Sequence, residues 1–304
     1  MDEFDKKLED LKSRIPALQS QSKARAEADP PENAVAVQQL PLWPEPVRAV
    51  PNGFLRSALF AAIGRGKRRY INGEDLAACG GVTVRYKGEQ LDQSDLDVWE
   101  SVLHAVRLQA LGTQCRVTSY SLLKLMGLTD TGGNRATLLQ RIERLVANAV
   151  TIRQGRYTYI GGLIEKAVRD EITHEWVIKI DPELAPIYSH DQFTMVDWAI
   201  RQSMSGKPLA QWLHGYYASH AKPFPVTMTT LLKNSGNKDA APTSARQTLR
   251  RALDVLSAAC TAASQPLTYE IVDDLVHVTK SPSATQRLHL HKKAVSKRAK
   301  KTRR

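Results

Sequence analysis

Hydrophobic and polar residues follow the same order twice along this chain. A short amphipathic segment is followed by a turn, a longer amphipathic segment with arginines on its polar side, and a stretch of alternating polarity. The first copy comprises Val117–Gly127, Thr129–Gly133, Asn134–Ala149 and strands from Val150; the second comprises Val226–Lys233, Asn234–Pro242, Thr243–Ala262 and strands from Leu267. Helix, turn, second helix and β-ribbon is the order of a winged helix, whose second helix can enter the DNA major groove.

The segments around the two copies complete an α+β fold. Asp95–Leu111 has apolar residues at helical spacing and acids in its first turn, which favours a helix. Leu209–His220 is an aromatic-rich helix, and the spacing of its aromatic residues favours a core stripe over a stacking platform for bases. Glu175–Ile180 alternates like a half-buried strand, and a closing hairpin is expected at Leu267–Ile271 and Leu275–Thr279.

The pattern therefore predicts two tandem winged-helix domains with a flexible N-terminal segment and a basic C-terminal tail. Gln19–Asn33 is rich in Ala, Gln, Ser, Pro and Glu, which is typical of a linker. The predicted boundaries are 1–51 for the N-terminal segment, 52–190 for the first winged-helix domain, 191–280 for the second and 281–304 for a disordered tail.

The second copy carries the stronger candidates for DNA contact. Ala245, Leu249, Leu253 and Leu256 form one apolar stripe, and the opposite side presents Gln247, Arg250, Arg251 and Asp254, with Arg246 on the flank. Arginine can bond bidentately to guanine and glutamine to adenine, and both also contact phosphate. The alternative is an ordinary solvated face, but acids are nearly absent from Ala240–Leu253, so the sequence favours DNA contact.

The first copy is less basic. Its predicted buried stripe is Leu138, Ile142, Leu145 and Val146, and its candidate DNA contacts are Asn134, Arg135, Thr137, Gln140, Arg141 and Arg144. Glu143 lies among them and weakens the attraction to phosphate. Arg153 and Arg156 flank Gly155 and are the candidate wing contacts, with a solvated turn as the alternative.

Charge and cysteine content narrow the class of protein. Of the formal net charge of +12, most comes from Lys280–Arg304, which has ten Lys and Arg and no acids. Such a tail suggests a polyanionic partner, although it can also be merely solubilising. The three scattered cysteines argue against a disulfide framework and for a reducing compartment. With no apolar run near the roughly 20 residues of a membrane span, we expect a soluble cytoplasmic protein.

Motifs for catalysis, metals and cofactors are weak throughout. Gly64–Arg68 lacks the spacing and hydroxyl of a phosphate loop, and Asp273-Asp274 is typical of a hairpin turn. His289-Leu290-His291 is similar to the metal motif of rolling-circle nickases, but it lies in the basic tail and no tyrosine follows it. We therefore expect a DNA-binding protein without catalytic residues, metal or cofactor.

Several short words of the sequence resemble the TrfA-type plasmid replication initiators. They are Leu42-Trp43-Pro44-Glu45, Arg48-Ala49-Val50-Pro51-Asn52, Arg56-Ser57-Ala58-Leu59-Phe60, Ser219-His220-Ala221-Lys222-Pro223-Phe224-Pro225 and Val272-Asp273-Asp274-Leu275-Val276-His277. The resemblance implies two winged-helix domains that bind directly repeated origin sequences (iterons), melt an AT-rich segment, and recruit the host helicase and initiator. It also implies a monomer–dimer equilibrium.

The same resemblance implies a peptide that binds the host sliding clamp. Related initiators carry Gln-Leu-x-Leu-Phe upstream of the Trp-Pro word, and Gln39, Leu40, Leu42 and Trp43 have that form here, although fused with the Trp-Pro word. An extended peptide of this kind could fill an apolar groove on a partner. In the alternative, Leu42 and Trp43 simply pack onto the first domain.

Two other functions fit parts of the sequence. A transcriptional repressor with tandem winged helices would need the same recognition helices, and an inverted repeat over a promoter would favour it over direct repeats beside an AT-rich tract. A nicking enzyme is the third interpretation, and nicking of supercoiled plasmid in the presence of magnesium would identify it. The leading hypothesis is the replication initiator.

Overall fold

Two three-stranded sheets with the same strand order accompany the two predicted helix pairs. The structure is a computed structural model that describes residues 40–64, 66, 68–108, 114–189, 192–237, 242–291 and 294. The described residues belong to one compact unit, Gln39–Arg304, and are mixed α and β. Gln39 itself, and with it the first residue of the predicted clamp peptide, lies outside them.

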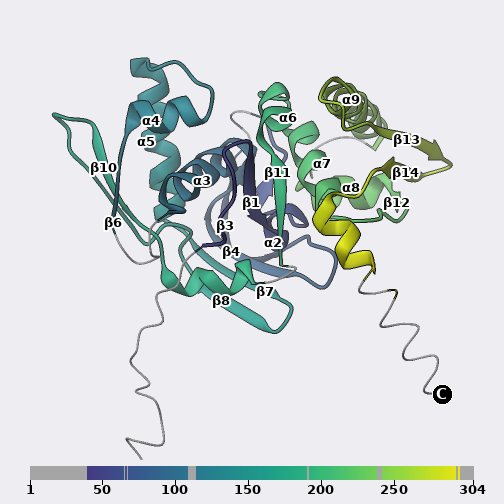
Figure 1. Ribbon diagram of the computed structural model, residues 1–304, viewed down its shortest axis with the longest axis horizontal. Helices are drawn as coiled ribbons and strands as arrows, with labels where there is room; N and C mark the ends of the chain where they lie inside the picture. Colours follow the sequence, from purple (N-terminus) through teal and green to yellow (C-terminus); the bar gives the residue numbers. More distant parts are fainter. Residues whose placement is uncertain are drawn as a thin grey trace, which may run out of the picture. The chain divides into compact units, whose positions relative to one another are not determined.

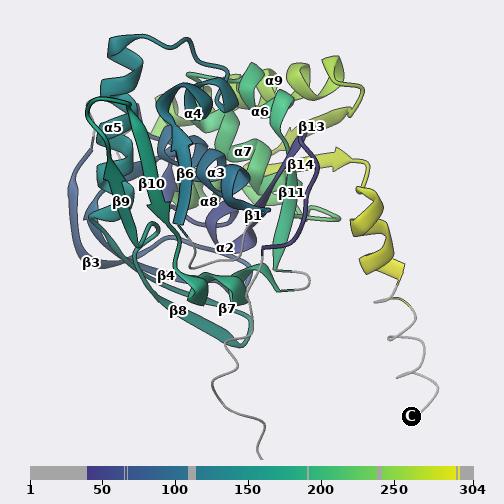
Figure 2. The same ribbon diagram turned by 60° about the vertical axis from the view of Figure 1, so that its left-hand side comes forward.

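The first group begins with α3 (Gln93–Val106), whose N-terminus is closed by a capping box between Asp92 and Asp95. Strand β6 (Gln114–Thr118) leads into α4 (Ser119–Leu125), and α5 (Gly132–Val146) follows after a turn. Strands β9 (Lys166–Arg169) and β10 (Glu175–Lys179) come later, and the sheet has the order β6-β10-β9 (Figure 2). Leu138, Ile142 and Leu145 of α5 are buried, as the spacing predicts.

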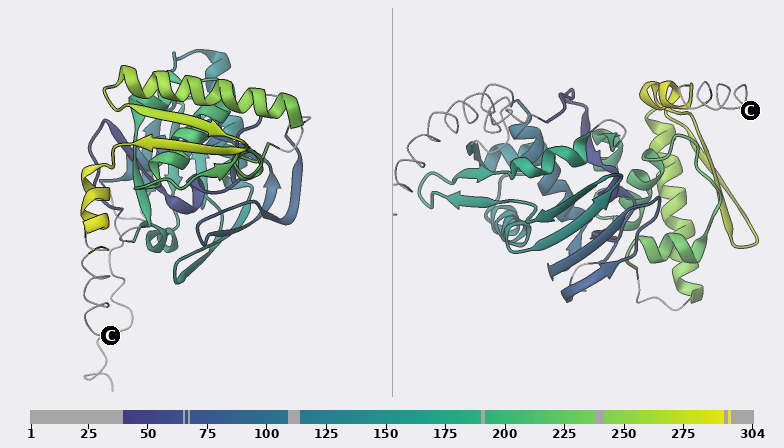
Figure 3. Two further views of the ribbon diagram at one scale, coloured as in Figure 1. Left: turned by 90° about the vertical axis from the view of Figure 1, so that its right-hand side faces the viewer. Right: turned by 90° about the horizontal axis from the view of Figure 1, so that it is seen from below.

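The second group repeats this arrangement. After α7 (Pro208–Ala218), strand β12 (Val226–Thr227) leads into α8 (Met228–Asn234) and α9 (Pro242–Ala262). Strands β13 (Leu267–Val272) and β14 (Leu275–Lys280) form the closing hairpin, and the sheet has the order β12-β14-β13. Figure 3 shows α9, the long yellow-green helix, lying alongside this hairpin. Both groups are therefore winged-helix-like in element order and strand order.

A separate sheet contains the strands that the sequence assigned to the first wing. Strands β7 (Ala149–Gln154) and β8 (Tyr157–Gly161) form a hairpin around Gly155, as predicted, but β7 also pairs with β4 (Thr83–Glu89). With β3 (Tyr70–Leu76) they make the sheet β3-β4-β7-β8. The prediction that this hairpin is the first wing is wrong, because the sheet that joins β6, the strand before α4, contains β9 and β10 instead.

Two hydrophobic clusters form the core. The first runs from Leu40 to Val196 and the second from Ile200 to Val278, with Ala62 added to the second. Strand β1 (Val47–Pro51) pairs antiparallel with β11 (Phe193–Asp197), and both strands lead directly into short helices, α2 (Asn52–Leu55) and α6 (Trp198–Ser203) (Figure 1). Residues 40–51, predicted as part of a flexible segment, thus contribute a strand and buried side chains to the first cluster.

Polar contacts join the two clusters. Arg201 of α6 is buried and binds Asp97 of α3 through Nε over 2.6 Å, and its Nη2 donates to the carbonyl of Gln93 over 3.0 Å. Arg56 donates through Nε to the hydroxyl of Ser219 over 3.0 Å. The remaining elements are β2 (Phe60–Ala61), β5 (Leu91–Asp92) and the 3-10 helix η1 (Pro182–Tyr188). No helix in the described part of the chain has the length and apolar composition that crossing a bilayer requires.

The C-terminal segment is more ordered than its composition predicts. Residues 284–291 are helical, whereas the sequence predicted a disordered tail from Ser281. Ser283 and Gln286 form a reciprocal cap, in which Gln286 N donates to Ser283 Oγ over 3.3 Å and Ser283 N donates to Gln286 Oε1 over 3.1 Å. Gln286 Nε2 also donates to the carbonyl of Ala218 over 2.6 Å, which ties this helix to the end of α7.

Candidate nucleic-acid interface

The N-terminal half of α9 presents an exposed basic face. Ala245, Leu249, Leu253 and Leu256 are buried in the second cluster. Arg246, Gln247, Arg250 and Arg251 are all exposed, as the helical spacing predicts. The helix contains no acid before Asp254, so its first three turns offer phosphate no repelling charge. Contact of these side chains with DNA remains a prediction.

The β13–β14 hairpin is fixed against this helix at two points. Asp274, in the hairpin turn, lies 3.2 Å from Arg246 Nη2, and Tyr269 donates its hydroxyl hydrogen to Asp254 Oδ1 over 2.5 Å. The carbonyl of Asp274 also accepts from the backbone N–H of Met228 at the start of α8 over 2.9 Å. The turn, the helix pair and the hairpin are therefore held in one arrangement, and Arg246 is the only arginine of the face whose ion pair to a described residue is seen.

The N-terminus of α5 presents a different, uncharged surface. Thr131 caps the helix by accepting a hydrogen bond from Asn134 N over 3.2 Å, and Asn134 Nδ2 donates to the carbonyl of Thr129 over 2.8 Å. Thr137 and Gln140 are exposed on the next turns. Arg135 is held by both carboxylate oxygens of Asp130 at 2.6 Å. The predicted candidates Asn134 and Arg135 thus stabilise the start of the helix.

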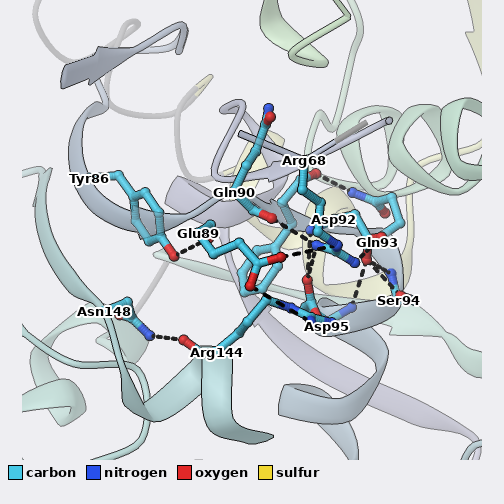
Figure 4. Close-up of polar contacts among 11 residues, drawn as sticks. Arg68, Tyr86, Glu89, Gln90, Asp92, Gln93, Ser94, Asp95, Arg144 and Asn148 are labelled. Carbon is cyan, nitrogen blue, oxygen red and sulfur yellow. Dashed lines mark hydrogen bonds and ion pairs between the residues drawn. The ribbon is translucent and has the colours of Figure 1, made fainter. Parts of the chain in front are cut away.

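Arg144 is directed away from the predicted outer face of α5. Its Nη2 donates to Asp95 Oδ1 over 2.9 Å, and only 13% of its side chain is exposed. Arg68 Nη1 binds the other oxygen of Asp95 over 2.8 Å (Figure 4). Burial and the neighbouring Asp92 raise the pKa of Asp95, and the two arginines oppose that shift. The predicted outward orientation of Arg144 is wrong, because a buried carboxylate on α3 requires a cationic partner.

Arg141 is less exposed than Thr137 and Gln140 on the same helix. It is half-buried on α5, and burial lowers its pKa, opposed by Asp95 of α3 and Asp92 at the cap of that helix. No described residue forms an ion pair with it at contact distance.

The predicted wing residues of the first copy lie in the four-stranded sheet. Arg153 is exposed on β7, and Arg156 is exposed beside the Gly155 turn with its guanidinium 5.0 Å from the ring centre of Tyr157. The hairpin equivalent to β13–β14 is β9–β10, and its turn contains Asp170, Glu171 and Ile172, with Ile172 90% exposed. This turn is acidic and apolar, so it is poorly suited to phosphate. The alternating strand at Trp176–Ile180 was the available signal for this hairpin.

Only part of the clamp-like peptide is accessible. Leu40 and Trp43 are buried in the first cluster, and Leu42 is 67% exposed. Trp43 Nε1 donates to His104 Nδ1 over 3.0 Å, while His104 Nε2 bonds Glu45 Oε2 over 2.7 Å. The Leu-Trp-Pro-Glu motif thus packs on the C-terminal end of α3. The packing alternative predicted that both Leu42 and Trp43 are buried, which holds for Trp43 but not for Leu42.

Sequence reasoning missed one cation beside the second helix pair. Lys233 is exposed in the last turn of α8, immediately before the turn that leads to α9. A helical wheel of α8 alone would have placed it outside the buried residues Met228, Leu231 and Leu232. Among the described residues, no group of three or more His, Cys, Asp and Glu is arranged to hold a metal ion.

Comparison with known proteins gives one family and a few relatives. The family model for the TrfA protein matches residues 16–280. The plasmid replication initiator protein TrfA of Escherichia coli is 25% identical over 203 residues, which are 62% of this chain and 51% of that protein, so the chain matches about half the length of this relative.

Solved structures are similar in fold. A crystal structure of domains 2 and 3 of RctB has a TM-score of 0.52 at 11% identity and covers 76% of this chain and 98% of that one. The Pi initiator protein in complex with iteron DNA has a TM-score of 0.46 at 11% identity, covering 62% of this chain and 91% of that one. The first similarity supports the winged-helix-like fold, and the second is too weak to support an argument.

Proposed function

The chain belongs to the TrfA family, and on that premise we propose that it initiates plasmid replication by binding iterons in an origin. One observation carries the DNA-binding part of the proposal. The first three turns of α9 contain no acid and expose Arg246, Gln247, Arg250 and Arg251 beside a hairpin fixed to the same helix. A helix of this kind can enter a major groove, where arginine and glutamine distinguish base pairs.

In this proposal the two groups of elements are tandem winged-helix domains with unequal roles. The second supplies the charged recognition helix, α9. The first supplies α5, whose exposed Thr137 and Gln140 can bond bases or phosphates but add no charge. Their repeated strand order, β6-β10-β9 and β12-β14-β13, supports this assignment. Binding by α5 alone would be weak, because most of the free energy of non-specific DNA binding is electrostatic.

The later steps of initiation rest on the family resemblance. We infer that the protein opens an adjacent AT-rich segment and recruits the host helicase, host initiator and sliding clamp. A monomer–dimer equilibrium would regulate it, and the site of action would be the bacterial cytoplasm. The chain would act by binding DNA and would cleave no bond.

Footprinting on the parent plasmid tests the proposal most directly. Protection of evenly spaced direct repeats beside an AT-rich tract would support it, and protection of one inverted repeat over a promoter would favour the repressor instead. A replicon with only this gene and the protected repeats should then transform a host. Failure to replicate despite correct footprints would reject the initiator function while leaving DNA binding intact. Nicking of supercoiled plasmid with magnesium would reject the assignment as a binding protein.

A further inference from the structure

A concave pocket of about 480 Å³ lies beside α9 on the side away from its hairpin contacts. Four parts of the chain line it: Ala62–Gly64 after β2, Lys207–Ala210 at the start of α7, Asn237 after α8, and one side of α9. The α9 residues are Thr248, Arg251, Ala252 and Val255, a spacing that places them on one stripe. Pockets for small ligands fall in the range of about 300–1,000 Å³, so this one is large enough.

The lining has an apolar floor and a cationic rim. Ala62, Leu209, Ala210 and Ala252 are buried and form the floor, with Ile63 and Val255 half-buried beside them. Lys207 and Arg251 are exposed at the rim, and no described residue forms an ion pair with either. Among the described residues, the lining contains no acid. Thr248 and Asn237 are its other side chains that can donate or accept hydrogen bonds.

This combination selects a small anion with a flat apolar body. A bare anion would leave the floor uncovered, and a neutral apolar molecule would leave the two rim cations without a counter-charge. A nucleoside monophosphate satisfies both parts, because its base is planar and carries hydrogen-bonding edges for Asn237 and Thr248 while its phosphate can bond Arg251 bidentately. We propose that this pocket binds a free nucleoside monophosphate or a closely similar phosphate ester.

Occupation of the pocket has a consequence for the recognition helix. Arg251 is shared between the pocket rim and the exposed basic face of α9. A phosphate held by Arg251 removes that guanidinium from the DNA face, and linkage requires DNA to weaken ligand binding by the same factor. This competition rests on the proposed function of α9, whereas ligand binding by the pocket does not.

Calorimetric titration of the full-length protein with AMP, dTMP, thymidine, inorganic phosphate and laurate tests ligand binding without DNA. We expect saturable binding of the monophosphates, at least tenfold weaker binding of thymidine and of phosphate, and at least a tenfold loss in Lys207→Glu. Lys166→Glu, an exposed cation of β9 far from the lining residues in sequence, is the matched control and should bind as the wild type does. Circular dichroism melting checks that both variants fold.

Several outcomes overturn the pocket assignment: no monophosphate binding, equal loss in both variants, or tighter binding of laurate than of nucleotides. A second measurement titrates DNA containing the footprinted repeats at saturating dTMP, where an affinity loss of about 5- to 150-fold is expected if Arg251 makes a base contact. If dTMP binds but does not change the affinity for DNA, only the competition between dTMP and DNA is rejected. If the protein does not bind the repeats even without dTMP, the proposed function is rejected.

Discussion

Arg144 of α5 and Asp95 of α3 form a buried ion pair with 2.9 Å between Nη2 and Oδ1. Asp95 has no exposed side-chain surface and is shared with Arg68 (Figure 4). Removing Arg144 leaves the buried carboxylate with one cationic partner instead of two, so Arg144→Ala should lower the free energy of unfolding by up to about 3 kcal/mol. Urea denaturation measures this change. Gln140→Ala, one turn earlier on the exposed side, should change stability by less than about 0.5 kcal/mol. An Arg144→Ala protein of wild-type stability that fails to bind DNA would restore Arg144 to the interface.

Arg250 and Arg251 should dominate base recognition. Each Arg→Ala substitution should weaken binding to the footprinted repeats by about 1–3 kcal/mol, because alanine cannot form the bidentate hydrogen bonds to a base. Arg246→Ala should cost less, since Arg246 already pairs with Asp274. Fluorescence anisotropy at physiological salt gives the affinities, with Arg85→Ala on β4, also exposed, as the matched control. Unchanged affinity in both the Arg250 and Arg251 variants would exclude α9 as the reading helix.

The basic end of the chain should add attraction without sequence preference. Because 284–291 is a docked helix, the informative truncation removes 292–304, which carries eight Lys and Arg, and keeps Gln286 on Ala218. The slope of log affinity against log salt should decrease by about 0.9 for each phosphate that the truncated protein no longer neutralises. The ratio of affinities for repeat and random DNA should stay constant or rise. A fall in that ratio would mean that the removed residues read sequence.

Among the described residues of the clamp-like peptide, Leu42 is the exposed hydrophobic side chain. The double variant Gln39→Ala, Leu42→Ala should keep repeat binding but lose capture of the host sliding clamp and support replication poorly. Trp43→Ala is the contrasting variant, because removal of a buried tryptophan should destabilise the protein by about 3–5 kcal/mol. Pull-down with purified clamp, beside thermal melting of each variant, separates binding from folding. Wild-type clamp capture by the double variant would leave the peptide with its packing role alone.

His214 of α7 should make the protein sensitive to mild acid. Burial, reinforced by Arg201, lowers the pKa of His214 to about 4. Above the unfolded-state pKa of about 6.5, the histidine is neutral in both the folded and the unfolded protein, and stability is not reduced. As the pH falls from there toward 4, the unfolded protein binds a proton that the folded protein does not, so the free energy of unfolding decreases. His214→Leu should therefore reduce the loss of unfolding free energy between pH 7 and pH 4.5 by up to about 3 kcal/mol. His291→Leu, an exposed histidine, is the control, and equal pH profiles for the wild type and His214→Leu would contradict the assignment.

The helix pairs were predictable because their signals are local. The buried stripes of α5 and α9 follow from spacing within each helix, and the caps at Thr131 and Thr227 lie next to the helices they close. The position of the first wing was not predictable in this way. The choice between β7–β8 and β9–β10 depends on which hairpin joins β6, a strand that precedes both by more than thirty residues.

Contacts distant in sequence account for the other differences. Arg144 lies on the polar side of its own helix, and only the approach of Asp95, 49 residues earlier, turns it inward. The sequence motifs shared with the family also make contacts across long stretches of sequence. Arg56 of one motif donates a hydrogen bond to Ser219 of another, 163 residues away. The helix at 284–291 had a local signal, the Ser-x-x-Gln cap at Ser283 and Gln286, which the basic composition obscured.

The pairing of β1 with β11 imposes an order on folding while the chain is being synthesised. Val47 cannot meet Asp197 until the ribosome has added the 150 residues from Arg48 to Asp197. At about 5–20 residues per second, this interval is roughly 8–30 s, during which β1 has no partner strand. Leu40, Trp43 and the rest of the N-terminal word can dock on α3 before that pairing forms. Completion of the first core is therefore delayed until β11 has been synthesised, just before the second group of elements, so slow translation between the two groups would prolong exposure of an unpaired, largely apolar strand.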